Sequence, residues 1–187
     1  MFKAILAGVC IGIASMMFLN VGGVVGAILF SFGLLAVVNY RWNLFTGMAG
    51  FTKDWKFLLL VLLFNIIGCG LVSLLVPTAI NTIVVTRLAV GWIKCLFLAM
   101  GCGFIMTTSV KFAREGNYLP LLFGVPVFIL CGFPHCIADV VYYLSCPFSF
   151  LLNNASGVLS VYASTVIGNY IGCNLYRLGE GNSGTIT

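Results

Sequence analysis

The stretch YLPLLFGVPVFILCGFPHCIADVVYYL, residues 118–144, decides the fold class of this chain. It is apolar over residues 118–133, breaks at Pro134-His135, and is apolar again over residues 137–144. A helix needs about 20 apolar residues to cross the hydrocarbon core of a bilayer. We therefore expect these two parts to form one membrane helix that is interrupted within the bilayer.

The composition of the whole chain supports a membrane setting. Of its 187 residues, 61% are hydrophobic and only 7% are charged, whereas a soluble domain carries about 25% charged residues. The mean hydropathy is +1.16. A soluble domain of this composition would expose large apolar patches to water. We predict an all-α polytopic membrane protein, which excludes a soluble enzyme, a nucleic-acid binder and a secreted disulfide scaffold.

Further apolar runs extend the prediction to six transmembrane helices. The second run is interrupted like the fifth, because polar residues 39–43 separate its two parts. We treat residues 1–187 as a single transmembrane domain, and we expect the polar, Gly-rich tail 179–187 to be mobile. The apolar runs cover residues 4–19, 24–38 with 44–51, 57–76, 90–108, 118–133 with 137–144, and 157–176.

The basic residues predict the orientation of the chain in the membrane. With the N-terminus inside, only Arg87 falls outside, as the positive-inside rule requires. Arg41 and Lys94 lie within the membrane region, where charges are costly and usually functional. We expect both termini to be cytoplasmic and the chain to lie in a prokaryotic cytoplasmic (inner) membrane. The cytoplasmic basic residues are Lys3, Lys53, Lys56, Lys111, Arg114 and Arg177.

An internal repeat is visible in the third and sixth runs. Residues 65–71 (NIIGCGL) and residues 169–175 (NYIGCNL) share the pattern N-x-I-G-C-x-L. Ordinary small-residue helix packing can explain such a match, but the two breaks also occupy corresponding places. We therefore predict an inverted 3+3 repeat, with repeat one at about 1–78 and repeat two at about 88–178, as in many transporters.

The two breaks predict a pathway at the interface of the repeats. Irregular backbone at membrane depth is tolerated only inside protein or beside a water-filled cavity. A half-helix that begins at a break presents free N–H groups and a positive dipole end, which favour an anion. His135, with an ordinary pKa of about 6.5, suits proton exchange, unless it is a buried residue satisfied by the backbone or by Thr46. Asp139 follows one turn later and can orient or charge-pair the imidazole.

Other residues in the membrane region allow two interpretations each. Lys94 is either a pore charge that attracts anions or a residue that reaches the outer interface. The eight cysteines contain no CxxC motif and are interpreted as small core residues, so we expect no metal site and no cofactor. Apolar side chains beside the breaks form either dewetting constrictions or ordinary lipid and core contacts. These side chains are Phe30, Leu34, Leu44, Phe45, Phe128 and Phe133.

Four stretches resemble the formate/nitrite transporter family of pentameric small-anion channels with an aquaporin-like fold. They are residues 26–34 (GAILFSFGL), 44–46 (LFT), 132–139 (GFPHCIAD) and 167–172 (IGNYIG). The resemblance implies that Thr46 hydrogen-bonds a central histidine, His135, and that Asn169 holds the last helix near the pore. It also implies a homo-pentamer. Of the apolar residues named above, it places Phe30, Leu34, Leu44, Phe45 and Phe128 in two hydrophobic constrictions.

The chain departs from the family pattern at several positions. Asn43 and Pro134 stand where the family has acidic residues, and Asp139 stands where it has Asn. The outer lysine of the family has no clear match, and Arg87 is the nearest cation. Lys94 falls where the family usually has an apolar constriction residue, and our hypothesis is that Lys94 takes over the role of the missing lysine.

Three functions remain open at this point. The first is passive or proton-coupled passage of a small monovalent anion, such as formate, nitrite, acetate, lactate or hydrosulfide, neutralised through His135. The second is an aquaporin-like channel for water, ammonia or urea. The third is a membrane-integral redox or accessory subunit, although the sequence lacks paired Cys or His residues that would hold haem or a cluster.

Overall fold

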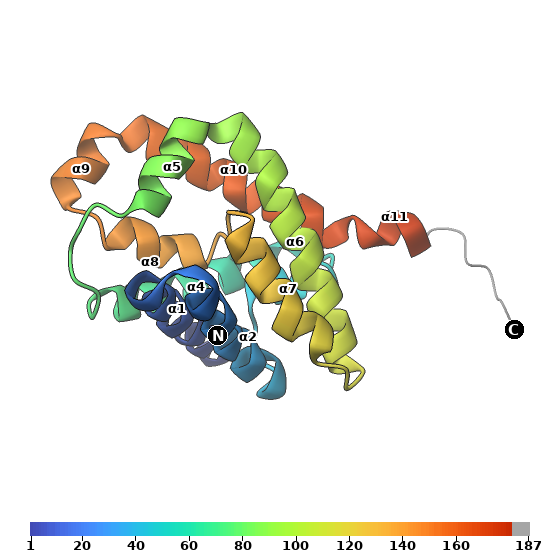
Figure 1. Ribbon diagram of the computed structural model, residues 1–187. Coiled ribbons are helices and arrows are strands. Elements are labelled where there is room, and N and C mark those ends of the chain that lie inside the picture. The colour runs from blue at the N-terminus through green and yellow to red at the C-terminus, as the bar shows by residue number, and fades with distance from the viewer. Residues whose placement is uncertain (181–187) are drawn as a thin grey trace, which may run out of the picture.

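The computed structural model describes residues 1–180, and the described chain is built from helices (Figure 1). The prediction of an all-α protein is confirmed. The predicted mobile tail falls almost entirely outside the described residues. The helices are α1 (Phe2–Val21), α2 (Gly23–Asn39), α3 (Phe45–Met48), α4 (Trp55–Ser73), α5 (Thr82–Val90), α6 (Trp92–Arg114), α7 (Leu119–Leu130), α8 (Ala138–Leu144), α9 (Phe148–Asn153), α10 (Ala155–Asn174) and α11 (Tyr176–Glu180).

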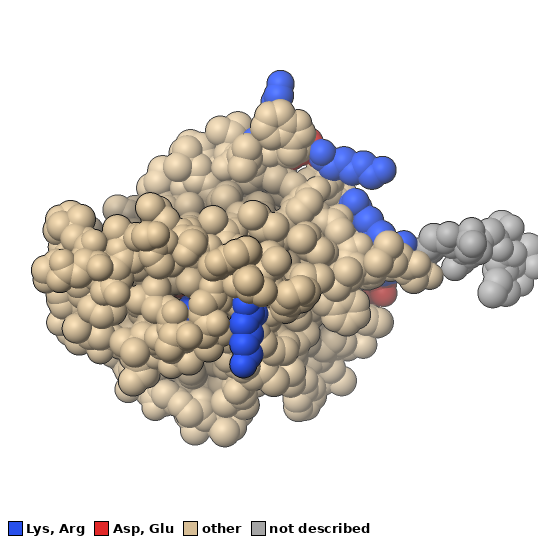
Figure 2. Space-filling model, turned by 90° about the horizontal axis from the view of Figure 1, so that it is seen from above, with Lys and Arg blue, Asp and Glu red and all other residues tan. Residues whose placement is uncertain are grey.

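Three of these helices, α1, α4 and α6, are long and apolar enough to cross a membrane. Two shorter apolar helices, α2 and α7, are each followed by a non-helical segment and then by a short helix. Figure 2 shows a surface on which few charged side chains appear. Large apolar side chains are exposed instead, for example Phe32 at 60% and Leu59 at 53%, which suits a surface that faces lipid.

The chain leaves α2 and α7 by the same local geometry. At the end of α7, Phe133 N–H donates to Phe128 O at 2.9 Å, and Gly132 N–H donates to Ile129 O at 2.9 Å. Gly132 has a φ of 68°. This is the Schellman motif, in which the residue after the helix adopts the left-handed conformation and is usually Gly.

Arg41 occupies the equivalent position after α2. Trp42 N–H donates to Val37 O at 2.9 Å, and Arg41 N–H donates to Val38 O at 3.1 Å. Arg41 has a φ of 52°, and it is the one described non-Gly residue with a positive φ. A side chain in this conformation is disfavoured by contact between Cβ and the backbone. Gly would therefore fit this position of the first break with less strain than Arg41.

The helices interlock across the two halves of the sequence. Helix α1 packs along α4, and α6 packs along α10, while α7 lies against both α2 and α6 (Figure 1). The short helix α8 packs onto α1 and α4, and the short helix α3 packs onto α6, α4 and α10. Each short helix therefore lies against long helices from the other half of the chain.

Candidate functional site

Asn65 fixes the start of α3. Its Oδ1 accepts a hydrogen bond from Phe45 N–H at 2.8 Å. Its Nδ2 donates to Ala4 O at 2.7 Å and to Asn43 O at 2.9 Å. A single buried amide therefore joins the end of the first break and the start of α3 to α1.

Asn169 does the same for the second break. Its Oδ1 accepts from Cys136 N–H at 2.8 Å. Its Nδ2 donates to Pro134 O at 2.9 Å and to Ala99 O, on α6, at 2.9 Å. The matched asparagines of the N-x-I-G-C-x-L pattern thus perform matched tasks. Free backbone groups at the breaks would be costly at membrane depth, and these amides satisfy several of them.

The cysteines of the same pattern connect the two halves. Cys69 Sγ, on α4, lies 3.3 Å from Ile137 O, at the start of α8. Cys173 Sγ, on α10, donates to Thr46 O, in α3, at 3.3 Å. Both cysteines are fully buried. Each thiol is a weak donor that lies beside a carbonyl group of the other half, although the Cys69 thiol lies closer still to Gly8 O, at 3.1 Å.

Thr46 and His135 meet between the two breaks. Thr46 Oγ1 and His135 Nε2 are 3.0 Å apart, and both residues are buried. His135 Nδ1 accepts a hydrogen bond from Ala138 N–H at 3.2 Å. Because Nδ1 acts as an acceptor, the neutral imidazole carries its proton on Nε2 and donates to Thr46 Oγ1.

Aromatic side chains pack beside the imidazole of this pair. The Phe128 ring stacks on the imidazole at a centroid distance of 5.7 Å, and the Phe30 ring meets Phe128 edge-on at 6.1 Å. Leu34, Leu44 and Phe45 are also buried, with exposed fractions of at most 3%. Phe133 is half-buried.

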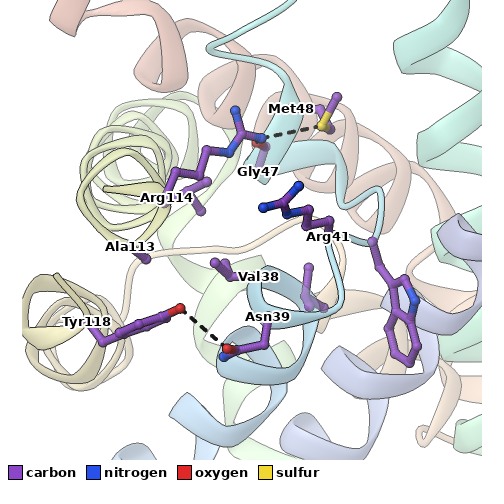
Figure 3. Close-up of a pocket in the computed structure, with 11 residues that line it drawn as sticks. Val38, Asn39, Arg41, Gly47, Met48, Ala113, Arg114 and Tyr118 are labelled. Atoms are coloured by element: carbon purple, nitrogen blue, oxygen red, sulfur yellow. Dashed lines mark hydrogen bonds between the residues drawn. The ribbon is translucent and has the colours of Figure 1, made fainter. Parts of the chain in front are cut away.

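Two cavities lie at opposite ends of α7. One, here called the His135 cavity, has a volume of about 210 Å³ and is lined by Phe128, Phe133, His135 and Asp139 among others. The other, the Arg41 cavity, has a volume of about 480 Å³ and is lined by Arg41, Arg114 and Tyr118 among others (Figure 3). Phe30, Leu34, Leu44 and Phe45 line neither cavity.

Asp139 pairs with Arg87 and not with the imidazole. Arg87 Nη2 lies 3.0 Å from Asp139 Oδ1, and the Asp139 side chain is fully buried. Arg87 Nη1 also donates to Gly132 O at 3.2 Å, at the second break. The sequence analysis expected Asp139 to orient or charge-pair the imidazole, and both residues line the His135 cavity. Its charged partner, however, comes from α5.

Lys94 does not join the other predicted pathway residues. It is exposed near the start of α6 and lines neither cavity. The exposed position of Lys94 follows from where α6 begins. Gly91, with a φ of 80°, ends α5, and α6 begins at Trp92. Lys94 therefore stands in the first turn of α6. Among the described residues, no group of three or more His, Cys, Asp or Glu side chains is arranged to hold a metal ion.

The arrangement defines a helical protein built around two facing chain breaks, with one Thr–His pair between two cavities. No protein-family model matches the chain. A stretch of it is 30% identical over 101 residues to a formate-nitrite transporter of Plasmodium malariae, and the match covers 49% of this chain. The match spans 31% of the length of that relative.

Two solved structures share the fold along nearly the whole chain. A pentameric formate channel with formate bound has a TM-score of 0.75 at 20% identity, covering 96% of this chain and 93% of that chain. An FNT family ion channel has a TM-score of 0.82 at 17% identity, covering 98% of this chain and 89% of that chain. The predicted resemblance to formate/nitrite transporters is confirmed, and the chain is an integral membrane protein with the fold of these channels.

Proposed function

We propose that this protein is a channel or transporter for small monovalent anions, such as formate, nitrite, acetate, lactate or hydrosulfide. The observation that carries the proposal is the buried Thr46–His135 contact between two breaks, with a cavity on either side. The fold shared with a formate channel supports it. The two arginines of the Arg41 cavity favour anions over cations, whereas Arg87 of the His135 cavity is paired with Asp139.

The proposed topology is a single transmembrane domain of six spans. In it α2 with α3, and α7 with α8, are the interrupted second and fifth spans, and the two halves form an inverted repeat. The matched contacts of Asn65 and Asn169 support the repeat. We place both termini on the cytoplasmic side because of the distribution of basic residues, and we propose a prokaryotic inner membrane as the location. We propose a homo-pentamer because one of the similar structures is pentameric.

The buried apolar residues around the Thr–His pair would reject a bare charge. Phe30, Leu34, Leu44, Phe45 and Phe128 have exposed fractions of at most 3%. Moving an unpaired anion past such side chains carries a large desolvation cost. A neutral weak acid avoids most of this cost. Protonation of the anion next to these residues would therefore permit passage.

His135 is the proposed proton donor, and the hydrogen bonds define how it would work. In the neutral ring, Nε2–H faces Thr46 Oγ1, and Nδ1 faces Ala138 N–H. A second proton can bind only at Nδ1, and the ring must first give up the bond from Ala138 N–H. The cationic ring would then pass the proton from Nε2 through the Thr46 hydroxyl to the anion, and Nδ1 would keep its new proton.

Flux measurements in proteoliposomes test this function. We expect uptake of formate or a related anion that rises as the pH falls, and His135→Asn should remove this pH dependence without preventing assembly. Thr46→Ser, which keeps the hydroxyl group, is the matched control and should retain the pH dependence of uptake. If His135→Asn keeps the parental pH dependence, the proton relay is wrong. If osmotic swelling occurs without anion flux, a neutral-solute channel replaces the proposal.

A further inference from the structure

The Arg41 cavity holds two arginines and no acidic residue in its lining. Arg41 enters from the segment between α2 and α3, and Arg114 enters from the last turn of α6 (Figure 3). Both side chains are exposed at the cavity mouth. Glu115 follows Arg114 in the chain but is not among the lining residues. In the described part of the chain, neither arginine forms an ion pair.

Arg114 is fixed in place with part of its guanidinium group free. Nη2 donates to Gly47 O at 3.3 Å, and the guanidinium carbon lies 4.1 Å from the centroid of the Phe51 ring. A guanidinium group above an aromatic ring keeps its N–H donors in its own plane. The Nε and Nη1 donors therefore stay able to bind an anion.

Arg41 stands in a backbone position that favours Gly. The same position at the second break is Gly132, in the same Schellman geometry. An arginine here is strained, and strained residues are often kept for function. The conformation carries the Arg41 side chain into the cavity, where Figure 3 shows its guanidinium group in the space between α2 and α6.

The rest of the lining suits a small organic anion. Val38, Val110 and Ala113 supply apolar walls, while Asn39 and Tyr118 supply polar groups linked by a 3.3 Å hydrogen bond. A volume of about 480 Å³ lies in the range of small-molecule sites and leaves much room around an anion as small as formate.

We propose that the Arg41 cavity binds a small dianion, such as a dicarboxylate, which blocks the pathway because it cannot pass the apolar side chains beyond. Two guanidinium groups match two negative charges, and each can form a charge-assisted hydrogen-bonded contact. Leu34 and Leu44 are buried, line neither cavity, and lie three residues before the lining residues Val37 and Gly47. Desolvating two charges costs more than desolvating one. The blocking step rests on the proposed anion pathway, whereas the binding step does not.

Calorimetric titration of the purified full-length protein tests the binding step. We use succinate as the dianion near neutral pH, and butyrate, which has the same carbon skeleton and one carboxylate, as the charge control. We expect succinate to bind about tenfold or more tightly than butyrate, because one charged hydrogen-bonded contact is lost. Arg41→Gly and Arg114→Gln should each weaken succinate binding about tenfold or more. Lys53→Gln, which removes a cation outside the cavity, should change nothing.

The Arg41→Gly variant separates loss of the site from loss of the fold. Gly relieves the left-handed conformation, so its thermal unfolding midpoint should equal or exceed that of the parent. Equal binding of succinate and butyrate, or full succinate binding by folded Arg41→Gly protein, would overturn the proposal.

Flux measurements distinguish this proposal from the anion pathway itself. In proteoliposomes, succinate on the side of the Arg41 cavity should inhibit formate flux, and succinate itself should not enter. If succinate does not change formate flux, or if succinate is taken up, the proposed inhibition is wrong and the proposed anion pathway is unaffected. Selective succinate binding without flux of any monovalent anion refutes the pathway and leaves the binding site intact.

Discussion

Removal of Arg87 from its buried ion pair with Asp139 should strongly destabilise the protein. In Arg87→Gln, a fully buried carboxylate loses the partner that lies 3.0 Å away. Breaking a buried pair in this way costs about 3–5 kcal/mol. For a chain of this size, about 1 kcal/mol shifts the unfolding midpoint by about 2–4 °C, so we expect a drop of about 6–20 °C. Thermal unfolding of the purified protein, followed by tryptophan fluorescence, measures it.

The double variant R87Q/D139N separates the ion pair from the individual side chains. It places two neutral amides where two charges stood, so it should be more stable than Arg87→Gln alone, with a coupling energy of about 0.5–3 kcal/mol. Asp139→Asn should cost less than Arg87→Gln because Arg87 keeps its bond to Gly132 O at 3.2 Å. Lys94→Gln, which removes an exposed cation, should stay within about 0.5 kcal/mol of the parent. Additive effects of the two single variants would refute the reasoning.

Three further predictions concern the breaks and the helix contacts. Asn169→Ala leaves the N–H of Cys136 and the O of Pro134 without their side-chain partner and should cost about 1–3 kcal/mol for each group that water cannot reach; the unfolding midpoint measures this loss. Gly172→Ala places a methyl group against the Met100 backbone and should cost about 1–3 kcal/mol, whereas Gly70→Ala, which meets no close backbone atom, should be neutral or stabilising. Arg41→Gly should raise stability by about 1 kcal/mol; a lower midpoint would show that Arg41 contributes to the fold.

The sequence allowed the outline of the site to be predicted because its residues carry local signals. The apolar run that stops at Pro134-His135 predicts irregular backbone there, and α7 ends at Leu130 with α8 starting at Ala138. The family resemblance placed Thr46 opposite His135, and the two side chains are in contact. The repeated asparagine was visible as a pattern. Its task, satisfying backbone groups on both sides of a break, follows from the fold and not from the pattern.

The charged partners could not be predicted in the same way. Asp139 is one helical turn from His135, so sequence spacing favoured that pair, whereas its partner Arg87 lies 52 positions earlier on α5. The exposure of Lys94 depends on where α6 begins, and helix ends are the least certain part of a sequence-based prediction. The sequence marked Arg41 as a charge within the membrane region, and its place shortly after an apolar run is where a helix is expected to end with Gly or Asn.

The contacts of Cys69 and Cys173 have a consequence for how the protein is made. A membrane chain is inserted from its N-terminus, so α3 reaches the bilayer long before α10 does. Thr46 and Cys173, joined by a hydrogen bond, are 127 positions apart, and α3 also packs on α6 and α10. The first break therefore lacks its final partners until the last long helix has been synthesised. The contacts around Thr46 are completed only as a late step of biogenesis, when the second half of the chain is already in the membrane.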